Sequence, residues 1–136
     1  PGGKIGKKLM RVEALMHGGK HCPRVAAETR MRDVIYEMSS KGLGMTCVVD
    51  DDHLLLGLIT DGDLRRHMDR APDILSLTAA DVMTRTPVTV GPDAFAFEAL
   101  NLMEQRKITA LVVVDPEPGR VVGVVHLHDL WPSELG

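Results

Sequence analysis

The chain has 136 residues, a formal net charge of −3, 44% apolar residues and only 3% aromatic residues. This length suffices for one compact domain, or for two very small domains that share a core. The scarcity of aromatic residues and the scattered basic residues exclude a base-stacking surface and an electrostatic footprint for nucleic acid. No apolar run approaches the roughly 20 residues of a membrane span, and no signal peptide is recognisable. We therefore expect no membrane partner. Two cysteines cannot form a disulfide framework, so we also expect a reducing, cytoplasmic compartment.

The chain begins with a segment unlike the rest. Residues 1–11 are rich in glycine and in basic residues. We interpret them as a linker or as the tail of a preceding domain. The sequence is therefore expected to be part of a longer protein.

An internal repeat dominates the remainder of the sequence. Four segments recur in the same order, and the offset between the two copies stays between 64 and 67 residues. One chance match would mean little, but four at nearly one offset indicate a duplication. The paired segments are residues 12–16 and 79–83, 23–25 and 87–90, 47–50 and 112–115, and 57–64 and 123–130. We expect a first repeat over 12–70, a linker over 71–78 and a second repeat over 79–136.

Each copy carries the same helical pattern. Apolar residues at i, i+3, i+4 and i+7 predict one buried helix face in each copy. These residues are Met31, Val34, Ile35 and Met38 in the first copy, and Ala96, Ala99, Leu100 and Met103 in the second. Gly42 is the expected stop of the first helix. Asp93 is the candidate N-cap of the second helix, and the basic Lys107 suits its C-terminal end.

Short runs rich in β-branched residues follow each of these helices and predict strands. They comprise residues 45–49 and 54–60 in the first copy and residues 111–114 and 121–125 in the second. A second helix is expected from Asp63 or Asp129. The predicted fold class is α/β, with two β-α-β-β-α repeats related by a pseudo-two-fold axis. They should pack sheet against sheet with helices outside, because one unit buries too little surface to stand alone.

The sharpest local motif is Gly-Leu-Ile-Thr-Asp-Gly-Asp at residues 57–63. A hydroxyl ends a buried strand, and a carboxylate follows three residues later at the start of a helix. Free backbone N–H groups and the helix dipole suit a phosphate there, and the carboxylate can accept both hydroxyls of a ribose. The same spacing is also that of a capping box, in which Thr60 and Asp63 only close the helix end. Both interpretations stay open on this motif alone.

A duplicated unit ending in Gly-apolar-apolar-Thr-x-x-Asp resembles the CBS-domain family over about residues 12–132. The resemblance implies that nucleotides bind in clefts between the repeats. It implies that Thr60 and Asp63 contact the phosphate and ribose in one cleft. In the second copy Asp129 matches the family pattern, whereas His126 stands where threonine or serine is usual. A histidine can donate to a phosphate, but it is larger and it titrates.

Several strings also resemble the C-terminal half of D-arabinose-5-phosphate isomerases. These are residues 59–66, 106–111 and 125–130, together with a start similar to the end of a sugar-isomerase (SIS) domain. Such enzymes interconvert ribulose 5-phosphate and arabinose 5-phosphate for Kdo and lipopolysaccharide synthesis, with catalysis in the SIS domain. The resemblance therefore implies a regulatory part without catalytic residues or a required cofactor. Its partners would be the SIS domain of the parent chain and a regulatory ligand, either CMP-Kdo or an adenine nucleotide.

Three more residues are candidates for ligand contact by position. Lys107 and Thr109 lie just before a core strand, near the place where the family's cleft opens, and Arg24 lies beside the first strand in the same way. The plain alternative for Lys107 is an exposed lysine favoured at a helix end.

His126 and His128 are two apart in a strand-like stretch and could share a side. No further ligand stands at a readable spacing, so no metal site is predicted.

A different interpretation is structural. The pair would then bind nothing and serve as a dimerisation element, and a homo-oligomer is expected under either interpretation. An independent enzyme is disfavoured, because no nucleophile with a neighbouring base is apparent.

Overall fold

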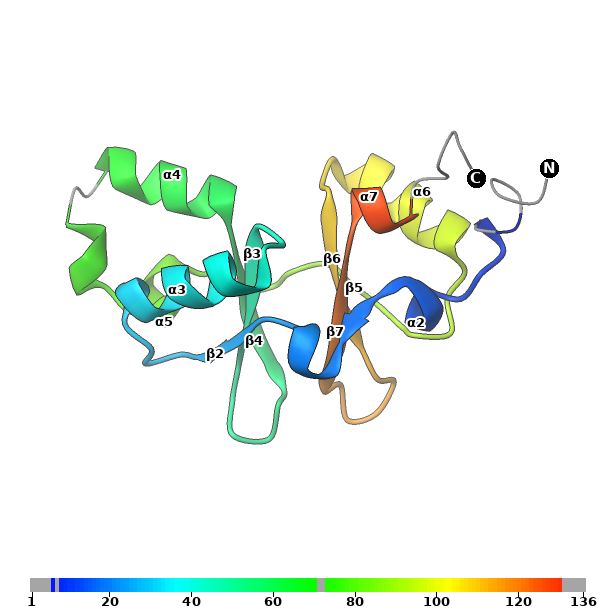
Figure 1. Cartoon of the computed structure of the whole chain (residues 1–136), viewed down its shortest axis with the longest axis horizontal. Coiled ribbons are helices and arrows are strands. Elements are labelled where there is room, and N and C mark those ends of the chain that lie inside the picture. The colour runs from blue at the N-terminus through cyan, green and yellow to red at the C-terminus, as the bar shows by residue number, and fades with distance from the viewer. Residues whose placement is uncertain (1–5, 7, 71–72, 131–136) are drawn as a thin grey trace.

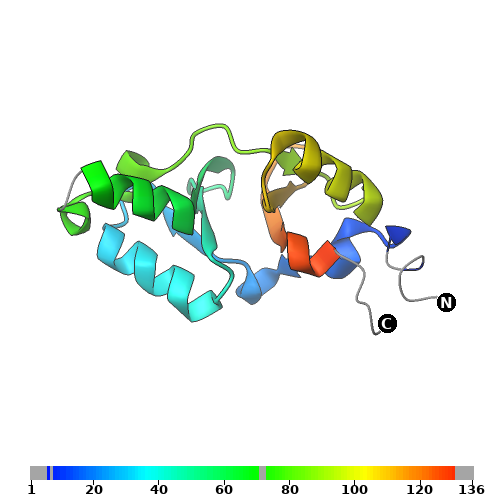
Figure 2. The ribbon, with the colours of Figure 1, turned by 90° about the horizontal axis from the view of Figure 1, so that it is seen from above.

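Two small β-sheets face each other at the centre of the molecule, and helices cover their outer sides (Figure 1). The computed structural model describes residues 6, 8–70 and 73–130. Seen from above, the two halves stand side by side with their helices away from the centre (Figure 2). The fold class predicted from the sequence, a pair of β-α-β-β-α units, is confirmed.

The first half holds a three-stranded sheet in the order β2-β3-β4. Strand β2 runs parallel to β3, and β3 runs antiparallel to β4. The elements are β2 (Arg24–Ala26), α3 (Met31–Lys41), β3 (Met45–Val49), β4 (Leu55–Thr60), α4 (Asp61–Arg70), η2 (Ile74–Ser76) and α5 (Ala79–Val82). Within the predicted linker, residues 71 and 72 lie outside the described residues.

The second half holds a four-stranded sheet in the order β1-β7-β6-β5. Its own repeat supplies β5 (Thr89–Val90), α6 (Ala96–Arg106), β6 (Ala110–Val114), β7 (Val121–His126) and α7 (Leu127–Leu130). The start of the chain supplies α2 (Val12–Leu15), β1 (His17–Gly18) and the short η1 (Gly19–His21). Strand β1 pairs antiparallel with β7.

Two helix ends differ in how well the sequence predicted them. Gly42 ends α3 in the left-handed conformation, with φ of 71°, and its N–H donates to the Met38 carbonyl. The expected N-cap Asp93 is wrong, because α6 begins only at Ala96. Phe95 stays extended because it bridges to Arg11, and its two neighbours bond with residues 10 and 12 of the chain start. The Glu98 carboxylate instead accepts the Phe95 N–H at 2.9 Å.

The short first helix of each repeat packs against the opposite half. Val12 of α2 is fully buried in a cluster with Val125 of the second sheet. Ala79 of α5 is fully buried in a cluster with Ile59 of the first sheet. The two halves are therefore interlocked through residues 12–18 and 79–84, an exchange that the local sequence pattern did not predict.

A third apolar cluster lies between the sheets. Cys47 and Leu58 from the first sheet meet Val112 and Val124 from the second, and all four are buried. The helix-spaced methionines are buried in the outer clusters, as predicted; they are Met31, Met38 and Met103. This third cluster holds the two sheets against each other.

Glycine is required in the repeated motif by packing. A Cβ on Gly57 would lie 2.6 Å from Met83 Sδ and 2.8 Å from the Thr84 carbonyl oxygen. A Cβ on Gly123 would lie 2.7 Å from Met16 Sδ. Met16 directly follows α2, and Met83 directly follows α5. The two glycines therefore allow each exchanged segment to approach the sheet closely.

Candidate functional site

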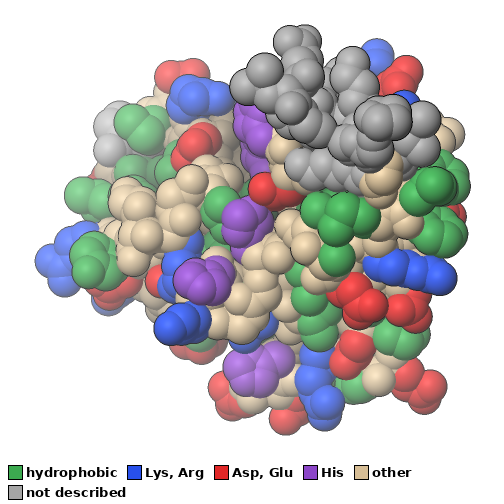
Figure 3. All heavy atoms as spheres, turned by 45° about the vertical axis from the view of Figure 1, so that its right-hand side comes forward, with side chains coloured by type: hydrophobic (Ala, Val, Ile, Leu, Met, Phe, Trp, Pro, Cys, Tyr) green, Lys and Arg blue, Asp and Glu red, His purple; other side chains and the backbone are tan. Residues whose placement is uncertain are grey.

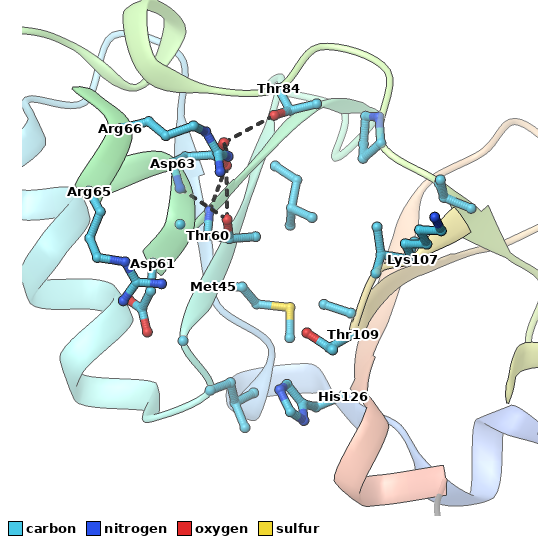
Figure 4. Close-up of a pocket in the computed structure, with 18 of the residues that line it drawn as sticks. Met45, Thr60, Asp61, Asp63, Arg65, Arg66, Thr84, Lys107, Thr109 and His126 are labelled. Carbon is cyan, nitrogen blue, oxygen red and sulfur yellow. Dashed lines mark hydrogen bonds and ion pairs between the residues drawn. The ribbon is translucent and has the colours of Figure 1, made fainter. Parts of the chain in front are cut away.

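A pocket of about 530 Å³ opens between the two halves, where β4 and β7 end. Thr60 and Asp63 line one wall, and Lys107, Thr109 and His126 line the opposite wall (Figure 4). Five of the seven ligand-binding residues predicted from the sequence therefore meet in one pocket. They come from both repeats, so the pocket exists only in the folded pair.

Thr60 and Asp63 form the first wall because β4 passes directly into α4. The backbone N–H and the hydroxyl of Thr60 donate to Asp63 Oδ2 at 2.9 and 3.1 Å. The Asp63 N–H approaches the Thr60 hydroxyl oxygen at 3.3 Å. This is the reciprocal geometry of a capping box. In the structure, the motif therefore closes the start of α4, whatever else it binds.

The other carboxylate oxygen of Asp63 is also occupied. Arg66 donates to Asp63 Oδ1 at 2.5 Å, and the Thr84 hydroxyl approaches it at 3.4 Å. Asp63 is buried, whereas the Arg66 side chain is 63% exposed. An ion pair with such an exposed partner contributes little to stability. Arg66 can therefore leave the carboxylate at small cost when another donor arrives.

The opposite wall begins at the end of α6. Lys107 is the C-cap of α6 in the left-handed conformation, with φ of 56°, and its side chain is exposed. The Thr109 carbonyl accepts the Leu127 N–H at 2.8 Å and so links the wall to α7. Arg65 and Arg66 add two cations from α4, and Asp61 adds an exposed carboxylate.

His126 completes this wall. Its backbone N–H donates to Asp129 Oδ2 at 2.8 Å, and its ring Nδ1 accepts the His128 N–H at 3.2 Å. The two histidine rings stack with centroids 4.8 Å apart. Burial lowers the pKa of His126, and the charge of His128 lowers it further, while Asp129 acts in the opposite sense.

The remaining two predicted residues, Asp129 and Arg24, lie outside the residues that line the pocket. Asp129 Oδ1 is bound by His17 Nε2 at 2.9 Å, behind the His126 wall. Arg24 Nη2 donates across the sheets to the Val121 carbonyl at 3.3 Å. Arg24 Nε is buried without a hydrogen-bond partner among the described residues.

The surroundings of Asp63 and Asp129 are related by the repeat. The His126 N–H bonds Asp129 as the Thr60 N–H bonds Asp63. His17 follows Met16 at the place where Thr84 follows Met83, and each of these residues approaches the carboxylate of the opposite repeat. The repeat offset therefore contained the signal for Thr84, which sequence analysis missed.

Other lining residues were also missed or weighed differently. Thr86, Gly44 and Met45 line the pocket without having been singled out in the sequence. Arg65 and Arg66 are exposed, and they line the pocket as well. Across residues 6, 8–70 and 73–130, no cluster of three histidine, cysteine or carboxylate side chains is placed to hold a metal ion.

Known protein families include one that matches both repeats of the chain. The CBS domain family matches the chain twice, over residues 12–70 and 79–130. The chain belongs to the CBS domain family. The two matches correspond to the two copies of the sequence repeat, so the molecule is a CBS pair.

Arabinose 5-phosphate isomerases contain regions similar to this CBS pair. The KdsD enzymes of Yersinia pestis and of Escherichia coli (strain K12) are each 45% identical to it over 131 residues, which is 96% of the chain. The Pseudomonas aeruginosa enzyme is 47% identical over the same length. The CBS pair spans only 39% to 40% of the length of these relatives.

Solved CBS pairs share the fold. A crystal structure of CBSX2 in complex with AMP superposes with a TM-score of 0.77 at 22% identity, covering 88% of this chain and 92% of that one. A CBS pair in complex with 5-methylthioadenosine and S-adenosyl-L-methionine gives 0.79 at 21% identity, covering 90% and 93%. In the described part of the chain, no helix has both the length and the apolar character needed to cross a membrane.

Proposed function

We propose that this CBS pair is the regulatory, nucleotide-binding part of an arabinose 5-phosphate isomerase and performs no catalysis itself. The observation that carries the proposal is the pocket, which joins Thr60 and Asp63 to Lys107, Thr109 and His126 across the two repeats. The 45% identity to KdsD enzymes supports the parent reaction, ribulose 5-phosphate to arabinose 5-phosphate. The active site would then lie in a SIS domain of the parent chain.

The proposed ligand contacts follow from the chemistry of the two walls. Ribose hydroxyls would donate to Asp63 Oδ1, replacing the exposed Arg66 guanidinium. The phosphate would lie against the Thr60 hydroxyl and the N-terminal turn of α4, where the helix dipole favours an anion. The freed Arg66 and Lys107 would supply positive charge on either side. The family resemblance implies a second ligand position at Asp129; His126, which it pairs with Asp129, lines the first pocket, and Arg24 stays a candidate contact by its position.

Two ligand classes are proposed. Related folds crystallised with AMP and with adenosyl compounds support an adenine nucleotide. The parent pathway supports CMP-Kdo, whose sugar acid carries a carboxylate that Lys107 could receive. Either ligand would act on the SIS domain as a regulator, and a cytoplasmic location belongs to the same proposal.

Thermal unfolding of the chain against AMP, ADP, ATP, CMP and CMP-Kdo tests the proposal. A ligand that binds only the folded state adds about 2.7 kcal/mol of stability at a hundredfold excess over its Kd. Thr60→Ala should weaken the response. Thr78→Ala is the matched control, because Thr78 and Asp81 form a second capping box with the same 2.9 and 3.1 Å bonds outside the pocket. Equal loss in both variants, or no response to any ligand, would contradict the proposal.

A second candidate function is a dimerisation element. The observation in its favour is a set of large apolar side chains exposed on the first half: Tyr36 at 74%, Met68 at 55% and Leu75 at 54%. Sedimentation equilibrium of the wild type and of Tyr36→Ser separates the two candidates. A dimer lost in Tyr36→Ser, together with no thermal response to nucleotides, would favour dimerisation alone.

A further inference from the structure

Unlike its repeat counterpart Thr60, His126 has a side chain that can take up a proton. The ring borders the pocket, and its Nδ1 accepts the backbone N–H of His128. A backbone N–H can only donate, so the neutral ring carries its proton on Nε2. Among the hydrogen bonds of the described residues none engages Nε2, which leaves this donor for a ligand.

The groups around His126 favour the neutral form of its imidazole. Burial lowers its pKa first, and His128 and His17 lower it further by repulsion, against the attraction of Asp129. The acceptor role of Nδ1 acts in the same sense, because it stabilises the neutral ring. Figure 3 shows histidine side chains following one another down one face of the molecule. The charged groups across the pocket are Asp61, Asp63, Arg65 and Arg66, and Lys107 lies on the same wall as His126.

An anionic ligand changes this balance. A phosphate or carboxylate beside the ring favours the charged imidazolium, and Asp129 already lies next to it to share the charge. The added proton comes from solvent and binds Nδ1, so the ring must turn away from the His128 N–H. Both ring nitrogens then donate, which an anion with several acceptor oxygens can use.

We propose that His126 couples ligand binding in this pocket to proton uptake, so that an anionic ligand binds more tightly as the pH falls. This inference rests on the pocket being the ligand site proposed above. The sign follows from linkage: affinity rises as the pH falls through the pKa of the bound state and levels off below that of the free state. For one coupled proton the slope is at most about tenfold in Kd per pH unit.

Calorimetric titration between pH 6 and 8, in two buffers of different ionisation enthalpy, counts the protons directly. AMP, CMP and inorganic pyrophosphate are the probes, for the wild type, His126→Gln and His67→Gln. The monophosphates titrate near pH 6 themselves. That contribution is common to all three proteins, so the difference between proteins isolates the imidazole. His67 is the matched control, since it is a histidine of α4 outside the residues that line the pocket.

The expected result is net proton uptake in the wild type and in His67→Gln, lost in His126→Gln together with the added pH dependence of Kd. Nucleotide binding with proton uptake unchanged in His126→Gln would overturn this inference and leave the proposed function standing. Proton-linked binding of pyrophosphate without nucleotide binding would support this inference and contradict the proposed nucleotide-binding function. Absence of binding by all three probes would contradict both.

Discussion

At the residue scale, the glycines of the repeated motif hold the exchanged segments against the sheets. Gly57 faces Met83 and the Thr84 carbonyl, and Gly123 faces Met16. The side-chain hydroxyl of Thr84 approaches Asp63 in the pocket. A change at Gly57 therefore reaches both the packing of α5 and the wall on which a ligand would lie.

Gly57→Ala should lower the free energy of unfolding by about 1–3 kcal/mol, because the added methyl overlaps a backbone oxygen as well as a flexible side chain. Urea unfolding measures the change as a lower midpoint. Gly91→Ala is the matched control, since nothing lies within 4 Å of its Cβ position. Equal midpoints for the two variants would show that the close approach carries no energy.

The two cysteines should differ in reactivity. A hydrogen bond from the Cys47 thiol lowers the pKa of Cys22 to about 7, and the nearby Arg24 charge helps, against the effect of burial. The hydrogen bond to Cys22 raises the pKa of Cys47, and burial raises it further. Thiolate is the reactive form. Pulsed alkylation followed by mass spectrometry should modify Cys22 first, more slowly in Arg24→Gln. Earlier modification of Cys47 would contradict this assignment.

At the element scale, the sequence predicted what depends on local pattern. Strand β3 and the stop of α3 at Gly42 lie where periodicity and glycine placed them. The predicted start of α6 was wrong, because pairing with the start of the chain keeps Phe95 extended and delays the helix to Ala96. The exchange of α2 and α5 was missed, since a four-residue helix carries no signal for the sheet on which it packs.

The same division holds for the candidate site. Thr60 and Asp63 were found because their spacing is a local motif, while Thr84 reaches Asp63 only through the exchanged segment. The sequence assigned His126 to a second cleft. It lines the pocket with Thr60 because the two sheets face each other, which no local pattern encodes.

The capping box of α5 should make stability depend on acid pH. The backbone and hydroxyl bonds from Thr78 lower the pKa of the Asp81 carboxyl. A depressed carboxyl pKa gives stability that is present above the unfolded value, about 4, and lost as the pH falls through the folded value. Thermal unfolding of the wild type and Asp81→Asn between pH 3 and 6 should therefore converge only at the acid end. A constant difference across that range would exclude the carboxylate as the cause.

At the scale of the whole molecule, the pocket depends on the interlocked pair. Its walls come from different repeats, and the exchanged segments cross between them. A ligand that bridges the walls would bind only the assembled pair and would stabilise it. This is the physical route by which the CBS pair would respond to a small anion.

A two-dimensional amide NMR titration of the chain with AMP and with CMP-Kdo tests whether a nucleotide binds between the two halves. If it does, shift changes concentrate on both walls at once, at Gly44, Thr60, Asp63, Lys107 and Thr109. Amides of the outer face of α3, such as Tyr36, should stay unchanged. Shift changes confined to one repeat or to the outer helices, or none with either nucleotide, would contradict the claim that this CBS pair binds a nucleotide between its halves.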